Sequence, residues 1–231
     1  MNVFIFLVLA AVVAYYFLRK KGRVEFVAET LVNDDLFQKY NDLMKESTTL
    51  KKAGKFEEAI EKIKEAYKEA QEKNLTLTAK DYLKLPPYLQ KAGKNDEAWA
   101  WFNGLIRTFA SDPMALSQIY EKMGLFRERE KNPKDAIKYS VLSNMYWCIG
   151  LHEQITQYGF TDRKTELKER KENITDGYGM WQLLETAGYL HLEKDLKKII
   201  KEHMKEFPNI RIPDVVRDIN KLMSEKNRIN Q

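Results

Sequence analysis

Two stretches of the sequence are nearly the same. KAGKFEEAIEKIKEA spans Lys52–Ala66, and KAGKNDEAWAWFNGL follows 39 residues later, at Lys91–Leu105. Self-similarity at a fixed period of this length is typical of repeat proteins, in which each repeat is one supersecondary unit. The chain is therefore expected to consist, at least in part, of repeated units.

Each unit reads as a helical hairpin. In the first stretch the apolar residues recur at three- and four-residue spacing, which predicts one face of a helix. The segment before it, from Leu36 to Met44, shows a second such face. Gly54 lies between the two segments, and glycine accepts the positive φ that a tight helix end requires.

Two further copies extend the pattern. Gly93 takes the turn in the second copy, and Asn132-Pro133 takes it in the third. Ala59, Ala98 and Ala136 then occupy the same place in the three units, at steps of 39 and 38 residues. A small side chain there lets the paired helices approach closely. Since one hairpin leaves an apolar side bare, such units are expected to stack.

These residues resemble the tetratricopeptide repeat family. The first unit matches the second half of such a repeat in Gly54, Phe56, Ala59, Ile63 and Ala66. The second unit matches in part, through Gly93, Ala98, Phe102 and Leu105. In the third, Gly124 stands twelve residues before Ala136, where these repeats often carry a first-helix glycine. The resemblance covers about Leu36 to Tyr146 and implies an all-α solenoid of about three hairpins over residues 36–150.

The second unit departs from the family pattern. Its Pro86-Pro87 pair falls inside the expected first helix, where a proline costs about 3 kcal/mol. That helix either begins at Pro86 or is split into two segments. Thr78 and Asp81 have the spacing of a capping box, which favours the earlier start. The period also exceeds the usual repeat length, so we expect longer loops.

The last part of the chain, residues 151–231, shows no clear match to the family. Residues 162–173 are a mixed-charge run, predicted as a solvated helix or linker with an ion pair between Glu166 and Arg170. Three amphipathic segments follow, at about 181–190, 192–204 and 213–226. We interpret them as a degenerate fourth hairpin and a terminal capping helix.

The N-terminus predicts a membrane anchor. Val3–Leu18 contains no charge, and as a helix its 16 residues span about 24 Å, short for a hydrocarbon core of about 30 Å. We predict a transmembrane anchor over residues 1–18 and a basic juxtamembrane segment over residues 19–35, whose cations can reach the interface. The basic residues are Arg19, Lys20, Lys21 and Arg23. A cleaved signal peptide is the alternative, but only Met1 and Asn2 precede the apolar run.

The basic flank also predicts topology. By the positive-inside rule it stays in the cytoplasm, so the rest of the chain is expected there too. A single-pass protein of the bacterial inner membrane is favoured, and the mitochondrial outer membrane is the alternative location. Four of the five net positive charges lie in this flank. The remainder is nearly balanced, so no nucleic-acid partner is expected.

The residues show no pattern for catalysis. The chain has one cysteine, Cys148, and its histidines, His152, His191 and His203, lie far apart, so no zinc-binding spacing occurs. Neither a phosphate-binding loop nor a serine nucleophile motif is present. We expect no enzyme activity, no catalytic residue, no metal site and no cofactor. Cys148 lies between Trp147 and Ile149 and is expected to be buried.

The resemblance implies a binding groove. In tetratricopeptide stacks the first helices line a concave surface that receives a peptide. Alignment on the shared alanines puts Lys45, Lys84 and Lys122 at equivalent first-helix positions, with Asn41, Lys80 and Gln118 one turn earlier. Two tiers of lysine and amide could hold an acidic segment or a terminal carboxylate, like a rough carboxylate clamp.

The resulting hypothesis is a membrane-anchored scaffold or adaptor that recruits a protein or peptide at the cytoplasmic face. Two alternatives stay open at this point. The chain could be a regulatory subunit of an enzyme complex, or an enzyme whose site the sequence hides. It could also be a receptor on the mitochondrial outer membrane.

Overall fold

The computed structural model describes residues 37–174 and 178–225, and every regular element in these ranges is a helix. The chain divides into two units, up to Leu77 and from Thr78 onward, and each is described by itself. The predicted anchor (residues 1–18) and basic segment (19–35) lie outside the described ranges. Within those ranges, no helix combines the length and the apolar character needed to cross a membrane.

The first unit is a helical hairpin, formed by residues 37–52 and α2 (Phe56–Glu72). Tyr40 and Leu43 on the first helix are buried, as is the predicted apolar face of α2. Lys39 Nζ lies 2.6 Å from Glu69 Oε2, which is itself nearly buried, so an ion pair joins the far ends of the two helices. This geometry confirms the helix–turn–helix prediction for the first copy.

The second unit begins with the split helix that the two prolines predict. The Thr78 capping box starts α3 (Ala79–Tyr82), and Pro86 occupies the first turn of α4 (Pro86–Lys91). The antiparallel α5 follows (Asn95–Thr108). Proline is tolerated in a first helical turn because its missing N–H has no partner there anyway. Both readings of Pro86-Pro87 are therefore partly right: a helix begins there, and a separate short one precedes it.

The next hairpin is formed by α6 (Pro113–Arg129) and the long α7 (Pro133–Tyr158). Trp99 of α5 joins it to the preceding helices: its ring packs on Phe126 and Tyr139, and its Nε1 donates to Glu130 at 3.2 Å. Trp101 instead donates to the carbonyl of Tyr82, in α3. The two tryptophans thus tie α5 to neighbours on different sides.

The three hairpin turns share one backbone geometry. Gly54, Gly93 and Lys131 have φ of 76°, 75° and 58°, and each lies five residues before the alanines already noted. In each turn this residue's N–H donates to the carbonyl three residues earlier, and the next N–H donates to the carbonyl five residues before it. The third turn therefore centres on Lys131, not on Asn132 as predicted. Asn132 instead caps α7, where its side chain accepts from the N–H of Asp135.

Small residues lie where the paired helices approach. Ala59, Ala98 and Ala136 are fully buried. A Cβ added at Gly124 would lie 3.4 Å from the carbonyl oxygen of Ala136, so α6 and α7 are in close backbone contact at this point. Any larger side chain at these positions would push the helices apart.

Helix α7 continues without a break through residue 150, where the sequence suggested a boundary. Gly150 is buried in it, against Met114 of α6. After a 3₁₀ turn (Thr161–Arg163) come α8 (Lys164–Glu172), α9 (Tyr178–Thr186), a second 3₁₀ turn (Leu190–Leu192), α10 (Glu193–Met204) and α11 (Ile212–Glu225). The three amphipathic segments predicted at the C-terminus are thus confirmed as helices.

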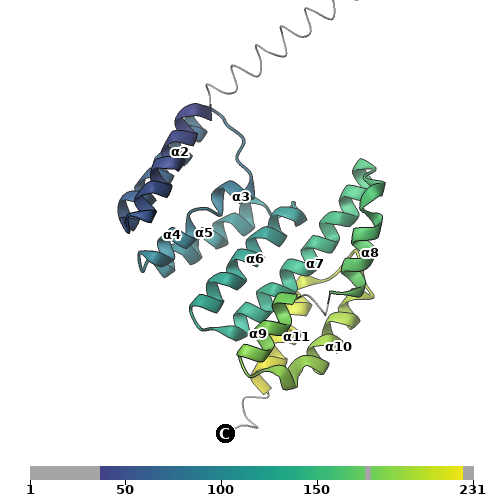
Figure 1. Ribbon diagram of the computed structural model, residues 1–231. Helices are drawn as coiled ribbons and strands as arrows, with labels where there is room; N and C mark the ends of the chain where they lie inside the picture. Colours follow the sequence, from purple (N-terminus) through teal and green to yellow (C-terminus); the bar gives the residue numbers. More distant parts are fainter. Residues whose placement is uncertain (1–36, 175–177, 226–231) are drawn as a thin grey trace, which may run out of the picture. The chain divides into compact units, whose positions relative to one another are not determined.

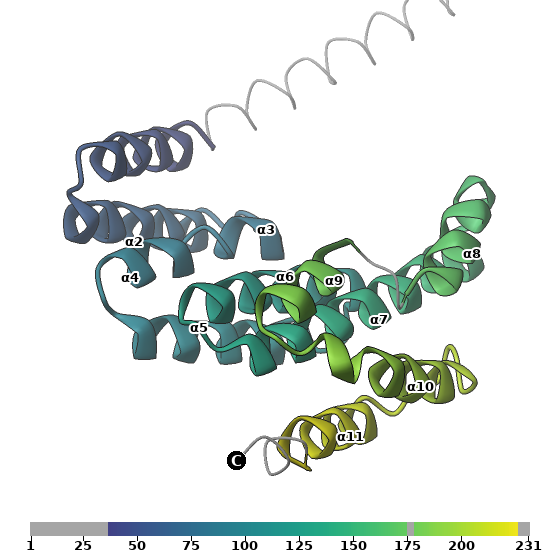
Figure 2. The ribbon, with the colours of Figure 1, turned by 60° about the horizontal axis from the view of Figure 1, so that its bottom comes forward.

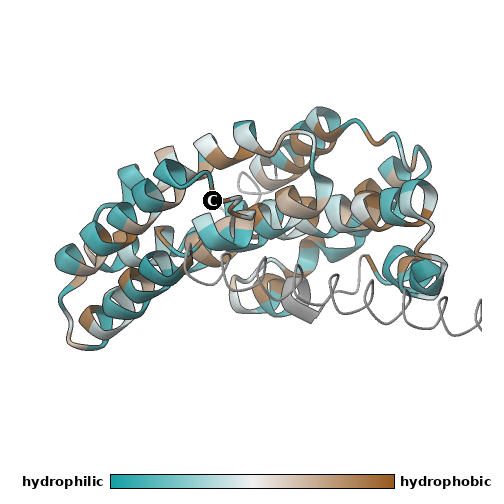
Figure 3. Ribbon diagram, turned by 90° about the horizontal axis from the view of Figure 1, so that it is seen from above, coloured by the Kyte–Doolittle hydropathy of each residue, from teal (hydrophilic) through white to brown (hydrophobic). Residues whose placement is uncertain are grey.

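The far side of α7 supplies a second core. Its apolar residues, among them Val141 and Met145, pack with Leu184 of α9, Leu196 of α10 and Val215 of α11. Figure 1 shows α10 and α11 beside the lower part of α7 and α8 beside its upper end. Figure 2 shows α10 and α11 lying side by side. Brown and teal alternate along the helices in Figure 3, as expected for helices with one apolar face.

One predicted ion pair is wrong. Glu166 does not pair with Arg170, four residues later. It binds Arg163, one turn earlier, at 2.9 Å, and accepts a hydrogen bond from Trp147 Nε1 at 3.3 Å. Arg170 lies over the ring of Trp147, 5.2 Å from its centroid. Both side chains therefore contact Trp147 of α7 instead of pairing with each other across one turn of α8.

Lys131→Gly tests the turn geometry. Lys131 adopts the left-handed conformation without the freedom of glycine, so Lys131→Gly is expected to raise the free energy of unfolding by about 0.5–1 kcal/mol. The measurement is urea unfolding of the full chain in detergent, followed by circular dichroism. The mirror variant Gly93→Lys should lower stability, although its Cβ would meet nothing within 4 Å. Equal stability of Lys131→Gly and the natural chain would contradict this account of the turn.

Ala98→Leu tests the close helix approach. Ala98 is fully buried, and the larger side chain is expected to cost about 1–3 kcal/mol of stability by overpacking. Ala100, in the same helix, is exposed, so Ala100→Leu is the matched control and should change stability by less than about 0.5 kcal/mol. Thermal unfolding of both variants gives the comparison, and similar losses in the two would argue against tight packing at Ala98.

Candidate functional site

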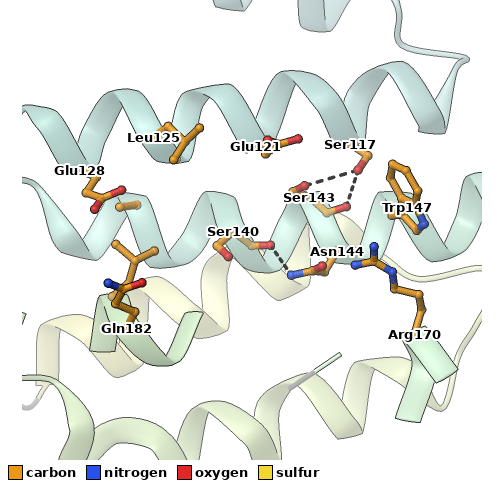
Figure 4. Close-up of a pocket in the computed structure, with 13 residues that line it drawn as sticks. Ser117, Glu121, Leu125, Glu128, Ser140, Ser143, Asn144, Trp147, Arg170 and Gln182 are labelled. Atoms are coloured by element: carbon orange, nitrogen blue, oxygen red, sulfur yellow. Dashed lines mark hydrogen bonds between the residues drawn. The ribbon is translucent and has the colours of Figure 1, made fainter. Parts of the chain in front are cut away.

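A groove of about 520 Å³ lies in the second unit, along the seam between α6 and α7 (Figure 4). This volume is in the range of typical ligand-binding clefts. Helix α6 contributes Ser117, Glu121, Gly124, Leu125 and Glu128. Helix α7 contributes Ala136, Ser140, Ser143, Asn144 and Trp147. Arg170 of α8 and Gln182 and Leu183 of α9 complete the wall.

Small residues form the floor of the groove. Gly124 and Ala136 allow the backbones of α6 and α7 to approach, and Ser117 is buried further along the same seam. The Ser117 hydroxyl donates to the carbonyl of Ser143 at 2.8 Å, which satisfies the buried oxygen and links the two helices. These contacts fix the spacing of α6 and α7 beneath the groove.

The groove exists because the covering helices are short. Helix α9 has 9 residues, about 14 Å, whereas α7 has 26 residues, about 39 Å. Gln182 of α9 lies at one end of the seam, and Arg170 of α8 lies at the other end (Figure 4). Between these ends the described residues leave the seam open, and Leu125 of α6, toward the Gln182 end, is exposed (Figure 4).

The two ends carry opposite charges. Trp147 and Arg170 form one end, where Glu166 holds the indole N–H and the guanidinium lies over the ring. Glu128 lies at the other end (Figure 4). Neither Arg170 nor Glu128 has an ion-pair partner among the described residues. Glu121, between them, is paired with Lys122 at 3.2 Å.

The described lining consists mostly of small and neutral polar side chains, with one arginine and two glutamates. Among the described residues that line the groove, none is histidine, cysteine, aspartate or lysine. No pair combines a nucleophile with a neighbouring base held by a third group, which is the usual arrangement of an activated nucleophile. Within the described parts of the chain, no cluster of histidine, cysteine, aspartate and glutamate could hold a metal ion.

The one cysteine lies behind the groove wall. Cys148 is buried in the α7 core, as expected. Burial raises the pKa of its thiol to about 11, against the opposing effect of the Arg170 and Lys171 charges. The thiol is therefore protonated at neutral pH and unsuited to act as a nucleophile.

The six residues predicted to line a partner groove lie elsewhere. Asn41 and Lys45 belong to the first unit, whereas Lys80, Lys84, Gln118 and Lys122 belong to the second. None of the six lines the groove described above. The three equivalent lysines each have a carboxylate nearby: Lys45 with Asp42 at 3.4 Å, Lys84 with Asp81 at 3.1 Å, and Lys122 with Glu121. The lysine groove stays a prediction.

A sequence signal for the seam groove does exist. The lining residues recur at the same helical spacing on both helices: positions 117, 121, 124 and 128 on α6, and 136, 140, 143 and 147 on α7. Most of them are small or polar, although this face borders a core. A small polar stripe at helical spacing could have indicated a surface that is neither packed nor fully solvated.

Protein-family models, curated proteins and solved structures were all compared with this chain, and none matches it.

Proposed function

We propose that the chain is a membrane-anchored scaffold of tetratricopeptide-like hairpins that recruits a partner protein through the seam groove between α6 and α7. The predicted N-terminal anchor would hold it in the membrane, with the helical part in the cytoplasm, as in the bacterial inner membrane. The proposal assigns it no chemistry of its own.

The repeated turn geometry supports the repeat architecture. Gly54, Gly93 and Lys131 reproduce one hydrogen-bond pattern at steps of 39 and 38 residues. Two further left-handed residues, Asn74 after α2 and Gly188 after α9, have the same hydrogen-bond pattern. A chain that repeats its turn and its small packing residue in this way fits a family of stacked hairpins.

The main support for a binding role is the open seam between α6 and α7. In a stack of hairpins, each seam is normally covered by the next unit. Here the described side chains of α9 lie at one end and leave a groove with an exposed leucine and polar walls. A concave surface of this kind, without an acid–base pair, fits the recognition of a peptide segment better than catalysis.

Leu125→Arg tests the proposal. Leu125 is 39% exposed inside the groove, so arginine can replace it without disturbing a core but would obstruct the seam. Affinity purification from native membranes in mild detergent should yield a discrete partner with the intact chain. Its yield should fall by about tenfold or more with Leu125→Arg, which corresponds to a loss of about 1.4 kcal/mol.

Leu190→Arg is the matched control, since Leu190 is 49% exposed and does not line the groove. It should retain the partner. Capture that is equal for both variants would move the binding surface away from the seam. If the intact chain captures no partner, the scaffold function is wrong.

A further inference from the structure

The charges of the seam groove define the kind of segment that it can hold. Figure 4 places Glu128 and Arg170 at opposite ends. The lining of α7 runs from Ala136 to Trp147, eleven residue steps and therefore about 16 Å along the helix axis. An extended peptide rises about 3.3 Å per residue, so about five residues span this length.

Both terminal charges are available to a ligand. Arg170 rests on the Trp147 ring, which orients the guanidinium and leaves its N–H donors for a carboxylate. Glu128 is exposed and has no cationic partner among the described residues. Lys122 already lies beside Glu121, so the negative charge at mid-groove is largely compensated. The groove is thus dipolar along its length.

Polar groups between the two ends of the groove can bind a peptide backbone. Gly124 and Ala136 are buried by the close approach of α6 and α7, so the polar side chains above them make the contacts with a ligand. The hydroxyl of Ser140 and the side-chain amide of Gln182 make no hydrogen bond to other described residues, and both face this space (Figure 4). They can donate to and accept from peptide groups.

We propose that the groove binds an extended peptide segment of the partner, about five residues long, with a carboxylate on Arg170 and a lysine or arginine beside Glu128. The residues between these two charges are small or polar. This inference rests on the proposed scaffold function and adds the chemistry of the partner segment. It differs from the acidic partner that the lysine positions suggest, because it requires a charge of each sign.

A peptide library provides the test. Immobilised heptapeptides, acetylated and amidated so that only side chains carry charge, are probed with the full chain in detergent. We expect enrichment of peptides with one acidic and one basic residue three to five positions apart, in one fixed order. Exposed charge pairs contribute modestly, so each should improve binding by about threefold to tenfold, and 0.5 M salt should remove most of this gain.

Charge-reversal variants show which end of the groove binds the acidic residue of the peptide and which end binds the basic one. Arg170→Glu should abolish the preference for the acidic residue and Glu128→Lys the preference for the basic one. The double variant should select the pair in the opposite order. Lys168→Glu is the control for net charge, since Lys168 is exposed on α8 and does not line the groove. It should leave the selection unchanged.

Two outcomes would overturn the inference: a library that shows no paired enrichment, or an enrichment that survives both reversals. Membrane purification with the same variants separates the two proposals. A partner that is lost with Leu125→Arg but retained with Arg170→Glu and Glu128→Lys leaves the scaffold function standing and removes the dipolar segment. Absence of any partner removes the scaffold function itself.

Discussion

The close contact between α6 and α7 is the constraint on which the second unit depends. Gly124 and Ala136 let the two backbones meet, and the Ser117 hydroxyl bonded to the Ser143 carbonyl holds them further along. Because α6 takes up one side of α7, the remaining sides are free to form the core with α9, α10 and α11. Helix α7, with 26 residues, therefore packs against α6 on one side and against the later helices on the others. It continues through residue 150 without a break.

The same contact creates the groove. Side chains small enough for a tight seam cannot fill the surface above it, so the seam stays hollow unless another helix covers it. Helix α9 is too short to do so, and α8 reaches the other end only through Arg170. A floor fixed by helix packing and walls from short helices make a surface that is pre-formed. A partner that binds there has little ordering cost to overcome on the side of this chain.

Much of the fold could be predicted because local rules and the tertiary structure agree. Gly54 and Gly93 marked turns that do have positive φ, and the Thr78 capping box and Pro86 gave the split helix. The third turn was displaced by one residue, since lysine at 131 does not suggest a left-handed conformation. The spacing from Ala136 locates this turn correctly, because the left-handed residue lies five residues before the shared alanine in all three units. The residue type at that position is not the same in the three units.

The groove was not predictable from the same rules. Its existence depends on how much of α7 the later helices cover, and its charge depends on Arg170 contacting Trp147 instead of Glu166. The sequence suggested that lysines at repeat-equivalent positions would bind the partner. Lys45, Lys84 and Lys122 each have a carboxylate beside them, so an acidic ligand would have to compete with an existing pair.

Exposed ion pairs are weak, and such competition alone does not exclude the lysines. The existing pairs do lower the binding free energy that each lysine can contribute. The carboxylate beside a paired cation partly cancels its field before the ligand arrives. Arg170 and Glu128 have no such partner among the described residues, and they lie at opposite ends of the seam (Figure 4). Two uncompensated charges of opposite sign at a fixed spacing can select both the composition and the direction of a bound segment. A row of equivalent cations would select only its overall charge.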